Sequence, residues 1–374
     1  MPRPFPFTAR ALGGLVTLAL ALSLQPAAAS ASPTPATRTT TDLRDPDTDL
    51  ILGWASHDLA TMEAEEAAFG TTNDMLSTYV DFVQQPDFPA AYAEAARTRG
   101  AALLIAWEPW DWAAAFDEQP EFAPQNIAAG AWDDHLRDWL STAQTYAEDL
   151  NVIVRLAPEM NDTARPWSAL PATAQHPGSS PSDYVDMWRH VAALKEVHAP
   201  DVMLMWNPLN YGAGPAPFED YFPGSEYVDT LALDGFNWDH AAPAAPGWQS
   251  PDDVFGFSRA DGPITRLAAL AGDKPWGIAE VASAPDDPAS FLPGGANYSA
   301  WGTWVFDYPE NPPYEQVADD WVTQEGWTRM MILRAADAGA SFVNYFHTNK
   351  ETDWRLTDTP SGREVFHVLA DRAG

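Results

Sequence analysis

Two glutamates stand where apolar runs give way to more polar segments. Residues 152–161 read Val-Ile-Val-Arg-Leu-Ala-Pro-Glu-Met-Asn, and Glu159 follows the apolar part of this run. Residues 274–280 read Lys-Pro-Trp-Gly-Ile-Ala-Glu, and Glu280 closes them. If both runs are parallel strands, each glutamate lies at the carboxyl end of its strand, where barrel enzymes carry their functional groups.

Cleavage of a glycosidic bond needs such a pair of acids. One carboxyl protonates the leaving oxygen, and the other, ionised, attacks the anomeric carbon. Carboxyls about 5–5.5 Å apart give retention of configuration, and wider pairs give inversion. Either glutamate taken alone is more often an exposed loop acid. The hypothesis therefore depends on the two being brought together.

Short apolar runs alternate with longer amphipathic stretches from Asp49 onwards. Continuous apolar runs are typical of parallel strands buried on both faces. We predict strands at Leu50–Ser56, Leu76–Val83, Ala101–Trp107, Asn151–Ala157, Val202–Trp206, Val228–Leu233, Trp276–Ala279 and Ser341–Phe346.

Helix-forming stretches lie between most of these runs. The segment Tyr211–Gly224 is the weakest, because its Gly and Pro residues leave room for only a short helix. We predict helices at Leu59–Phe69, Pro89–Arg99, Ile127–Asp149, Ser182–Val197, Asp252–Ala271, Trp321–Ala336 and Ser361–Ala370.

This alternation predicts an α/β fold, a single-domain (β/α)8 TIM barrel. A doubly wound open sheet is the alternative. No G-x-G-x-x-G follows the first predicted strand, so dinucleotide binding has no support. The fourth and seventh strands lie on opposite sides of an eight-stranded ring, so Glu159 and Glu280 can face each other across its mouth.

Several segments resemble a known family in their order and in their places at strand ends. They are Leu104–Trp110, Arg155–Asn161 followed by Pro166-Trp167, Tyr227–Asn237, Lys274–Glu280 and Asp353-Trp354-Arg355. Over roughly residues 50–356 the chain resembles glycoside hydrolase family 26, the β-mannanase-type members of a large clan of retaining barrels. The resemblance implies Glu159 as general acid/base and Glu280 as nucleophile. It also implies that Asn161, Asp234, Trp107 and Trp354 lie near the reacting sugar.

Two positions depart from the pattern of that family. The residue before the acid/base is typically His and here is Pro158, and the aromatic residue of the sixth strand is typically Tyr and here is Phe236. A phenylalanine cannot donate the hydrogen bond that the tyrosine gives to the nucleophile. Tyr298, Tyr345 or His347 are the candidates to compensate. A binding protein that has lost turnover is a second interpretation of these changes.

The tryptophans near the strand ends are candidate sugar platforms, with core packing as the alternative for each one. Arg155 either holds a carboxylate of the pair or belongs to a structural ion pair. We expect the substrate-binding residues to be Trp107, Trp110, Asn161, Trp167, Trp206, Asp234, Phe236, Trp238 and Trp354.

The first residues have the features of an export signal. Arg3 and Arg10 precede an apolar run, Ala11–Leu24, and A-x-A sites follow it. We predict a signal peptide at residues 1–31, a flexible Ser/Thr/Pro leader at 32–46 and the barrel at 47–374, in a secreted protein. A retained membrane anchor is the alternative.

Composition narrows the function classes. The chain of 374 residues has no cysteine, which removes thiol catalysis, and a formal net charge of −33, which disfavours nucleic acid and anionic membranes. The eight histidines are scattered without H-E-x-x-H, and no G-x-S-x-G occurs. We therefore expect no metal and no cofactor, a monomer, and a polysaccharide or oligosaccharide as the partner.

The sequence therefore predicts a secreted, retaining glycoside hydrolase of a β-linked polysaccharide, of the β-1,4-mannan type by resemblance. A β-1,3-1,4-glucanase or a xylanase on the same fold is the first alternative. A non-catalytic carbohydrate-binding barrel and a metal-dependent barrel hydrolase are the others.

Overall fold

The protein is described from a computed structural model, which covers residues 43, 50–174, 176–211, 216–239, 247–285, 323–350, 352–356 and 365. The predicted signal peptide and Tyr298 lie outside these residues, as do almost all of the leader and of the last predicted helix. Within the described part, no helix combines the length and the apolar character needed to cross a membrane.

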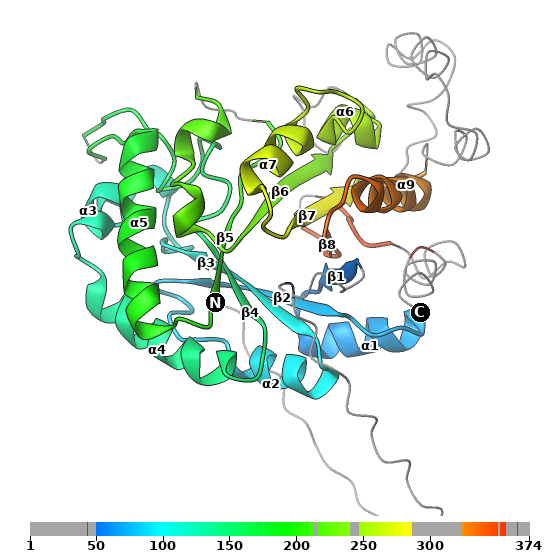
Figure 1. Ribbon diagram of the computed structural model, residues 1–374, viewed down its shortest axis with the longest axis horizontal. Helices are drawn as coiled ribbons and strands as arrows, with labels where there is room; N and C mark the ends of the chain where they lie inside the picture. Colours follow the sequence, from blue (N-terminus) through cyan, green and yellow to red (C-terminus); the bar gives the residue numbers. More distant parts are fainter. Residues whose placement is uncertain are drawn as a thin grey trace, which may run out of the picture. The chain divides into compact units, whose positions relative to one another are not determined.

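Parallel strands close into a barrel in chain order, β1 to β8, which confirms the predicted (β/α)8 fold (Figure 1). The strands are β1 (Ile51–Ala55), β2 (Met75–Asp81), β3 (Ala102–Glu108), β4 (Val152–Leu156), β5 (Met203–Trp206), β6 (Thr230–Asn237), β7 (Trp276–Ser283) and β8 (Phe342–Phe346). The open-sheet alternative is excluded, because β1 pairs with β8 over its whole length.

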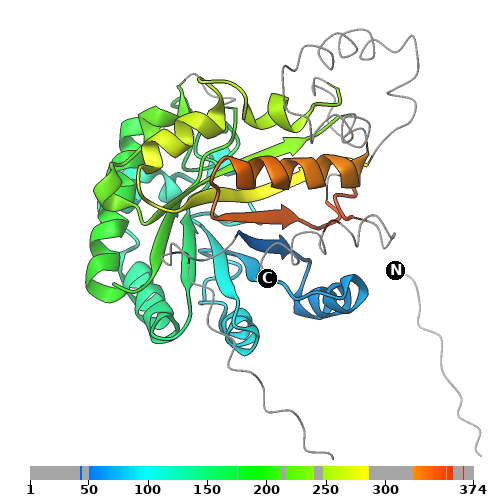
Figure 2. The same ribbon diagram turned by 45° about the vertical axis from the view of Figure 1, so that its right-hand side comes forward.

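Helices surround the strands (Figure 2). They are α1 (Leu59–Phe69), α2 (Ala90–Arg99), α3 (Pro124–Ala128), α4 (Asp133–Ala147), α5 (Pro181–His198), α6 (Pro251–Phe255), α7 (Pro263–Ala271) and α9 (Gln324–Asp337). Short 3-10 turns are η1 (Phe116–Glu118), η2 (Pro120–Phe122), η3 (Phe218–Tyr221) and η4 (Ser225–Tyr227).

Local chemistry explains where several helices begin and end. The α1 helix is capped by Asp58, whose side chain accepts from the Thr61 amide, and at its other end by Gly70 in a left-handed conformation. The helix predicted at Ile127–Asp149 is divided into α3 and α4 around Gly130, which has a φ of +86°. The one predicted at Asp252–Ala271 is divided into α6 and α7 after Gly256, at +68°. Each break was missed because the apolar spacing continues through it.

The alternation of the strands sorts side chains into two cores. One set faces the helices. The other is a smaller cluster inside the barrel, to which every strand contributes: Ile51, Met75, Ala102, Leu104, Ile153, Met203, Met205, Ala232, Ala279 and Phe342. Further along the strands, the same inward-facing positions are occupied by polar groups, among them Arg155 on β4 and Asp234 on β6. These positions form the candidate site.

Candidate active site

Arg155 is the centre of the polar layer above the inner core. It is only 2% exposed, and its guanidinium donates to three groups on three other strands or strand ends. Its Nε donates to Asn207 Oδ1 at 2.6 Å, and its Nη2 donates to Asp234 Oδ2 at 2.6 Å. Its Nη1 donates to Glu280. Of the two roles considered for Arg155, the structure shows the first, because Arg155 binds Glu280 of the pair, and it binds Asp234 as well.

Glu280 reaches the interior of the barrel because of a bulge in β7. Leu233 of β6 pairs with Ile278, but the next residue, Asp234, pairs with Glu280, so Ala279 is an extra residue. Since Ala279 already belongs to the inner core, strict alternation would turn Glu280 outward; the bulge turns it inward instead. The Glu280 amide then donates to Asp234 Oδ1 at 2.7 Å, which fixes the bulge.

Glu159 follows β4 in a strained segment. Ala157 and Glu159 have φ values of +44° and +56°, which cost roughly 1–3 kcal/mol each in residues other than glycine. Three hydrogen bonds hold the segment in place. The Glu159 amide donates to Asn207 O at 2.8 Å, Trp167 Nε1 donates to Pro158 O at 2.7 Å, and the Tyr184 hydroxyl donates to Ala157 O at 3.2 Å. Backbone strain that is held by such bonds is typical of functional sites.

The carboxylate of Glu159 is bound by Arg165, a residue that the sequence interpretation missed. Arg165 Nη2 donates to Glu159, and its guanidinium lies 5.7 Å from the centre of the Trp110 ring. Burial is the largest single influence and raises the pKa of Glu159. The charge and hydrogen bond of Arg165, together with the charges of Arg155 and Lys350, outweigh it, so that the pKa is lowered overall. Arg165 therefore favours the carboxylate form of Glu159 over the protonated form in the unliganded protein.

Glu108 is a further acid that the sequence interpretation missed. On β3 it shares the inward face with Leu104, and Trp112 Nε1 donates to its Oε2 at 2.7 Å. Burial raises the pKa of Glu108, with Arg165 opposing and Glu159 adding to this effect. The alternation of β3 could have found it, because Glu108 lies four residues after an inward leucine and Trp107 lies on the opposite face.

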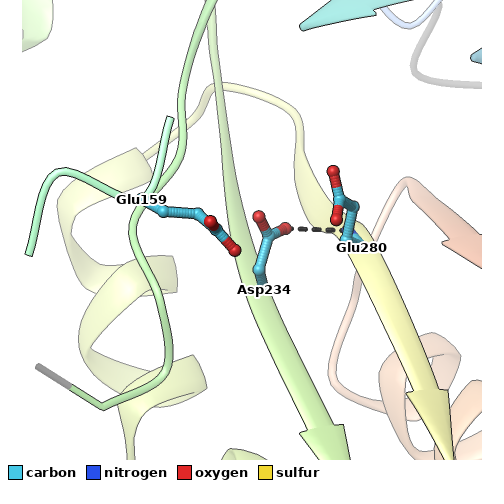
Figure 3. A group of neighbouring side chains, drawn as sticks. All are labelled: Glu159, Asp234 and Glu280. Atoms are coloured by element: carbon cyan, nitrogen blue, oxygen red, sulfur yellow. Dashed lines mark hydrogen bonds between the residues drawn. The ribbon is translucent and has the colours of Figure 1, made fainter. Parts of the chain in front are cut away.

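Three carboxylates converge in this layer (Figure 3). Glu159, Asp234 and Glu280 are buried, and each offers one oxygen that lies within 4.8 Å of the oxygens of the other two. Burial raises the pKa of Asp234 well above its usual range, although Arg155 opposes this effect. Such spacing could hold a cation, but two of the three carboxylates already bind the Arg155 guanidinium, which supplies that charge.

Two predicted substrate contacts are wrong because the side chains point to the other face of their strands. Trp107 is fully buried and stacks on Trp139 of α4, with ring centres 4.1 Å apart. Trp206 is also fully buried and packs against Phe218 and Phe222 outside the barrel. Both are core residues, which was the alternative interpretation.

Two more predicted contacts have structural partners. The indole nitrogen of Trp167 holds the backbone before Glu159, and its ring is fully buried. Asn161 is fully buried too; it accepts from the Leu209 amide at 2.8 Å and donates to the Leu209 carbonyl at 3.0 Å. Both residues therefore support the loops that carry the site.

Three of the remaining predicted aromatic residues lie together: Phe236 near the end of β6, Trp238 just after it and Trp354 after β8. Phe236 contacts Trp238 and Trp354, with ring centres 5.6 and 5.5 Å apart, and the two tryptophan rings are 5.0 Å apart. Trp354 is fully buried, whereas Trp238 and, on the β3 side, Trp110 are half-buried. Trp110 and Trp238 thus remain the predicted sugar platforms.

Comparison with known proteins gives one similar curated sequence. No protein-family model matches the chain. Endoglucanase H from Acetivibrio thermocellus is 26% identical over 300 residues, which are 79% of this chain and 27% of that protein. The chain thus spans about a quarter of the length of this relative.

Solved structures show the same fold. A GH26 β-mannanase from Bacteroides ovatus has a TM-score of 0.51 at 12% identity, covering 87% of this chain and 90% of that one. The chain resembles glycoside hydrolase family 26. GH26C from a Muricauda species gives a TM-score of 0.51 at 13% identity over 87% and 86% of the two chains. At these identities the two structures show that the chain shares their fold.

Proposed function

We propose that this family 26-like barrel is a retaining glycoside hydrolase, with Glu280 as nucleophile and Glu159 as general acid/base. The observation that carries the proposal is the approach of these two acids at one mouth of the barrel, with carboxylate oxygens within 4.8 Å of each other. Short separations between the two carboxyls belong to enzymes that retain the anomeric configuration. The predicted secretion belongs to the same proposal.

The first step forms a glycosyl-enzyme. The Glu280 carboxylate accepts a hydrogen bond from Arg155. It attacks the anomeric carbon while the glycosidic C–O bond breaks. Glu159 acts in its protonated form and gives its proton to the leaving oxygen. In the second step Glu159 takes a proton from water, the resulting hydroxide attacks the anomeric carbon, and the ester bond to Glu280 breaks. The sugar leaves with its original configuration, and both acids return to their starting states.

Asp234 serves this cycle as a support for the nucleophile. It accepts from the Glu280 amide through Oδ1 and from Arg155 through Oδ2, so it fixes both the backbone and the cation beside the nucleophile. It was predicted as a substrate-binding residue, and its full burial favours the supporting role.

Substrate and product analysis tests the proposal. We expect hydrolysis of a β-1,4-mannan, with proton NMR showing that the first product has the configuration of the cleaved bond. Mixed-linkage β-glucan is the second candidate substrate, because the curated relative at 26% identity is an endoglucanase. Xylan completes the panel. Binding to these polymers without any release of reducing sugar would instead support the non-catalytic barrel, and inversion would contradict the assigned mechanism.

Replacing Arg165 with glutamine tests the role of Glu159 as acid. Because Arg165 lowers the pKa of Glu159, the protonated form required in the first step is lost at lower pH than it would be without this arginine. We expect Arg165→Gln to move the basic limb of the kcat/KM profile to higher pH. The measurement is kcat/KM between pH 4 and 9 on the best substrate, roughly the range in which carboxyl and histidine groups titrate.

Arg97→Gln is the matched control for this profile. Arg97 also pairs with carboxylates, Glu94 and Asp149, but on the surface of α2. Arg97→Gln removes the same charge as Arg165→Gln and should leave the basic limb of the kcat/KM profile in place. A basic limb that stays unchanged in Arg165→Gln, or that moves to lower pH, would rule out Glu159 as the acid.

A further inference from the structure

Tyr79 points into the barrel from β2. Met75 belongs to the inner core, and alternation along the strand places Tyr79, four residues later, on the same face. In the sheet, Tyr79 pairs with Ala106 of β3, and Ala106 pairs with Arg155 of β4. Tyr79 and Arg155 therefore occupy the same row, separated by one small side chain, on the face where Arg155 binds Glu280.

The hydroxyl of Tyr79 lies in the site without a standard hydrogen-bond partner among the described residues. Its oxygen is buried, and it makes no hydrogen bond of standard geometry with the described residues. Among charged groups, Glu280 acts on it most strongly, ahead of Arg155 and Asp234. A buried hydroxyl without a partner is costly, and catalytic hydrogen bonds are often long before substrate binds.

The Tyr79 hydroxyl keeps its proton at neutral and acidic pH. Burial raises the pKa of Tyr79 well above its usual range, and the negative charge of Glu280 adds to this effect. The group is thus a donor that faces a carboxylate.

Where the family pattern has a tyrosine on the sixth strand, this chain has Phe236, which carries no hydroxyl. Phe236 lies edge-on to Phe346 at 5.8 Å, and Phe346 lies edge-on to Tyr79 at 6.4 Å, so one aromatic contact chain joins the two positions. Of the compensating residues suggested by the sequence, the two that the structure describes are engaged elsewhere. The Tyr345 hydroxyl donates to Trp354 O at 2.8 Å, and His347 Nε2 lies 3.5 Å from Glu65.

We propose that Tyr79 is a positioning residue for Glu280, whose carboxylate it orients by donating a hydrogen bond from β2 in place of the one that Phe236 cannot donate from β6. This inference rests on the proposed role of Glu280 as nucleophile. The bond holds the attacking oxygen toward the anomeric carbon, and it stabilises the carboxylate again when the glycosyl-enzyme ester breaks.

Tyr79→Phe removes the hydroxyl and keeps the ring that packs on Phe346. We expect kcat to fall roughly 10- to 100-fold, as for a lost hydrogen bond to a charged group, with KM little changed. Tyr221→Phe is the matched control. Tyr221 is also buried and its hydroxyl also lacks a standard partner among the described residues, but it packs against Tyr184 of α5, outside the barrel. It should keep wild-type kcat.

A second background separates positioning of Glu280 from a general structural role. In Glu280→Ala supplied with azide, the external anion attacks an activated aryl β-glycoside, and no Glu280 carboxylate remains to be oriented. There, adding Tyr79→Phe should change the azide-dependent rate by less than about threefold, since the two residues act as one unit. A structural defect would lower both rates equally.

The outcomes are distinct. A loss in the wild-type background that disappears in Glu280→Ala supports the inference. No loss, or an equal loss in both backgrounds, overturns it while leaving the proposed function intact. Near wild-type hydrolysis by Glu280→Ala without azide would instead refute the proposed function itself.

Discussion

Glu280→Ala is expected to lower kcat on the best polysaccharide by roughly four orders of magnitude or more. The methyl group cannot attack the anomeric carbon, and the geometry offers no substitute. Asp234 is a neighbouring acid, but both of its oxygens are engaged, one by the Glu280 amide and the other by Arg155. The substrate should still bind, so KM should change far less than kcat.

Azide rescue makes this prediction specific to the nucleophile. With an activated aryl β-glycoside, azide can occupy the space of the missing carboxylate, form the bond to the anomeric carbon and expel the aryloxide. We expect a glycosyl azide of the opposite configuration, identified by NMR. Glu94→Ala, which removes an exposed acid of α2, is the control and should hydrolyse at the wild-type rate. A β-configured azide, or substantial hydrolysis without azide, would contradict the assignment.

The barrel could be predicted from sequence because its strands are buried on both faces and are therefore continuously apolar. The ends of β6 and β7 were less visible. Asp234, Phe236 and Glu280 were expected at or after strand ends, yet they lie within strands that continue to Asn237 and Ser283. Polar residues inside a strand interrupt the apolar pattern, and this interruption was interpreted as a boundary.

The side chains that surround the two acids were harder to predict. Tryptophans were chosen by residue type, and Trp107 proved to face α4, whereas its neighbour Glu108 faces the site. Counting alternate residues from Leu104 would have selected Glu108. The same count gives Tyr79 from β2. The bulge that turns Glu280 inward and the position of Arg165 beside Glu159 depend on contacts between distant segments, which no local pattern carries.

Loss of the buried positive charge of Arg155 should have the largest effect on the stability of the protein. Arg155 is buried and is the cation that both Asp234 and Glu280 bind. Replacing it with methionine keeps much of its volume but leaves two buried carboxyls without this partner. Breaking a buried ion pair from one side costs about 3–5 kcal/mol. We therefore expect Arg155→Met to lose about that much free energy of unfolding in urea titrations near neutral pH, together with activity.

The pH dependence of that loss identifies its cause. Burial already raises the pKa of Asp234, and removing Arg155 removes the main influence that opposes it. A carboxyl whose pKa is higher in the folded than in the unfolded state favours folding at low pH and opposes it as pH rises toward the folded value. The difference in unfolding free energy between Arg155→Met and wild type should therefore be smaller at acidic than at neutral pH. Arg97 has exposed partners, so Arg97→Met should change the free energy of unfolding by less than about 1 kcal/mol at any pH. A deficit in Arg155→Met that is independent of pH would show that packing, and not the two unpaired carboxyls, causes the loss.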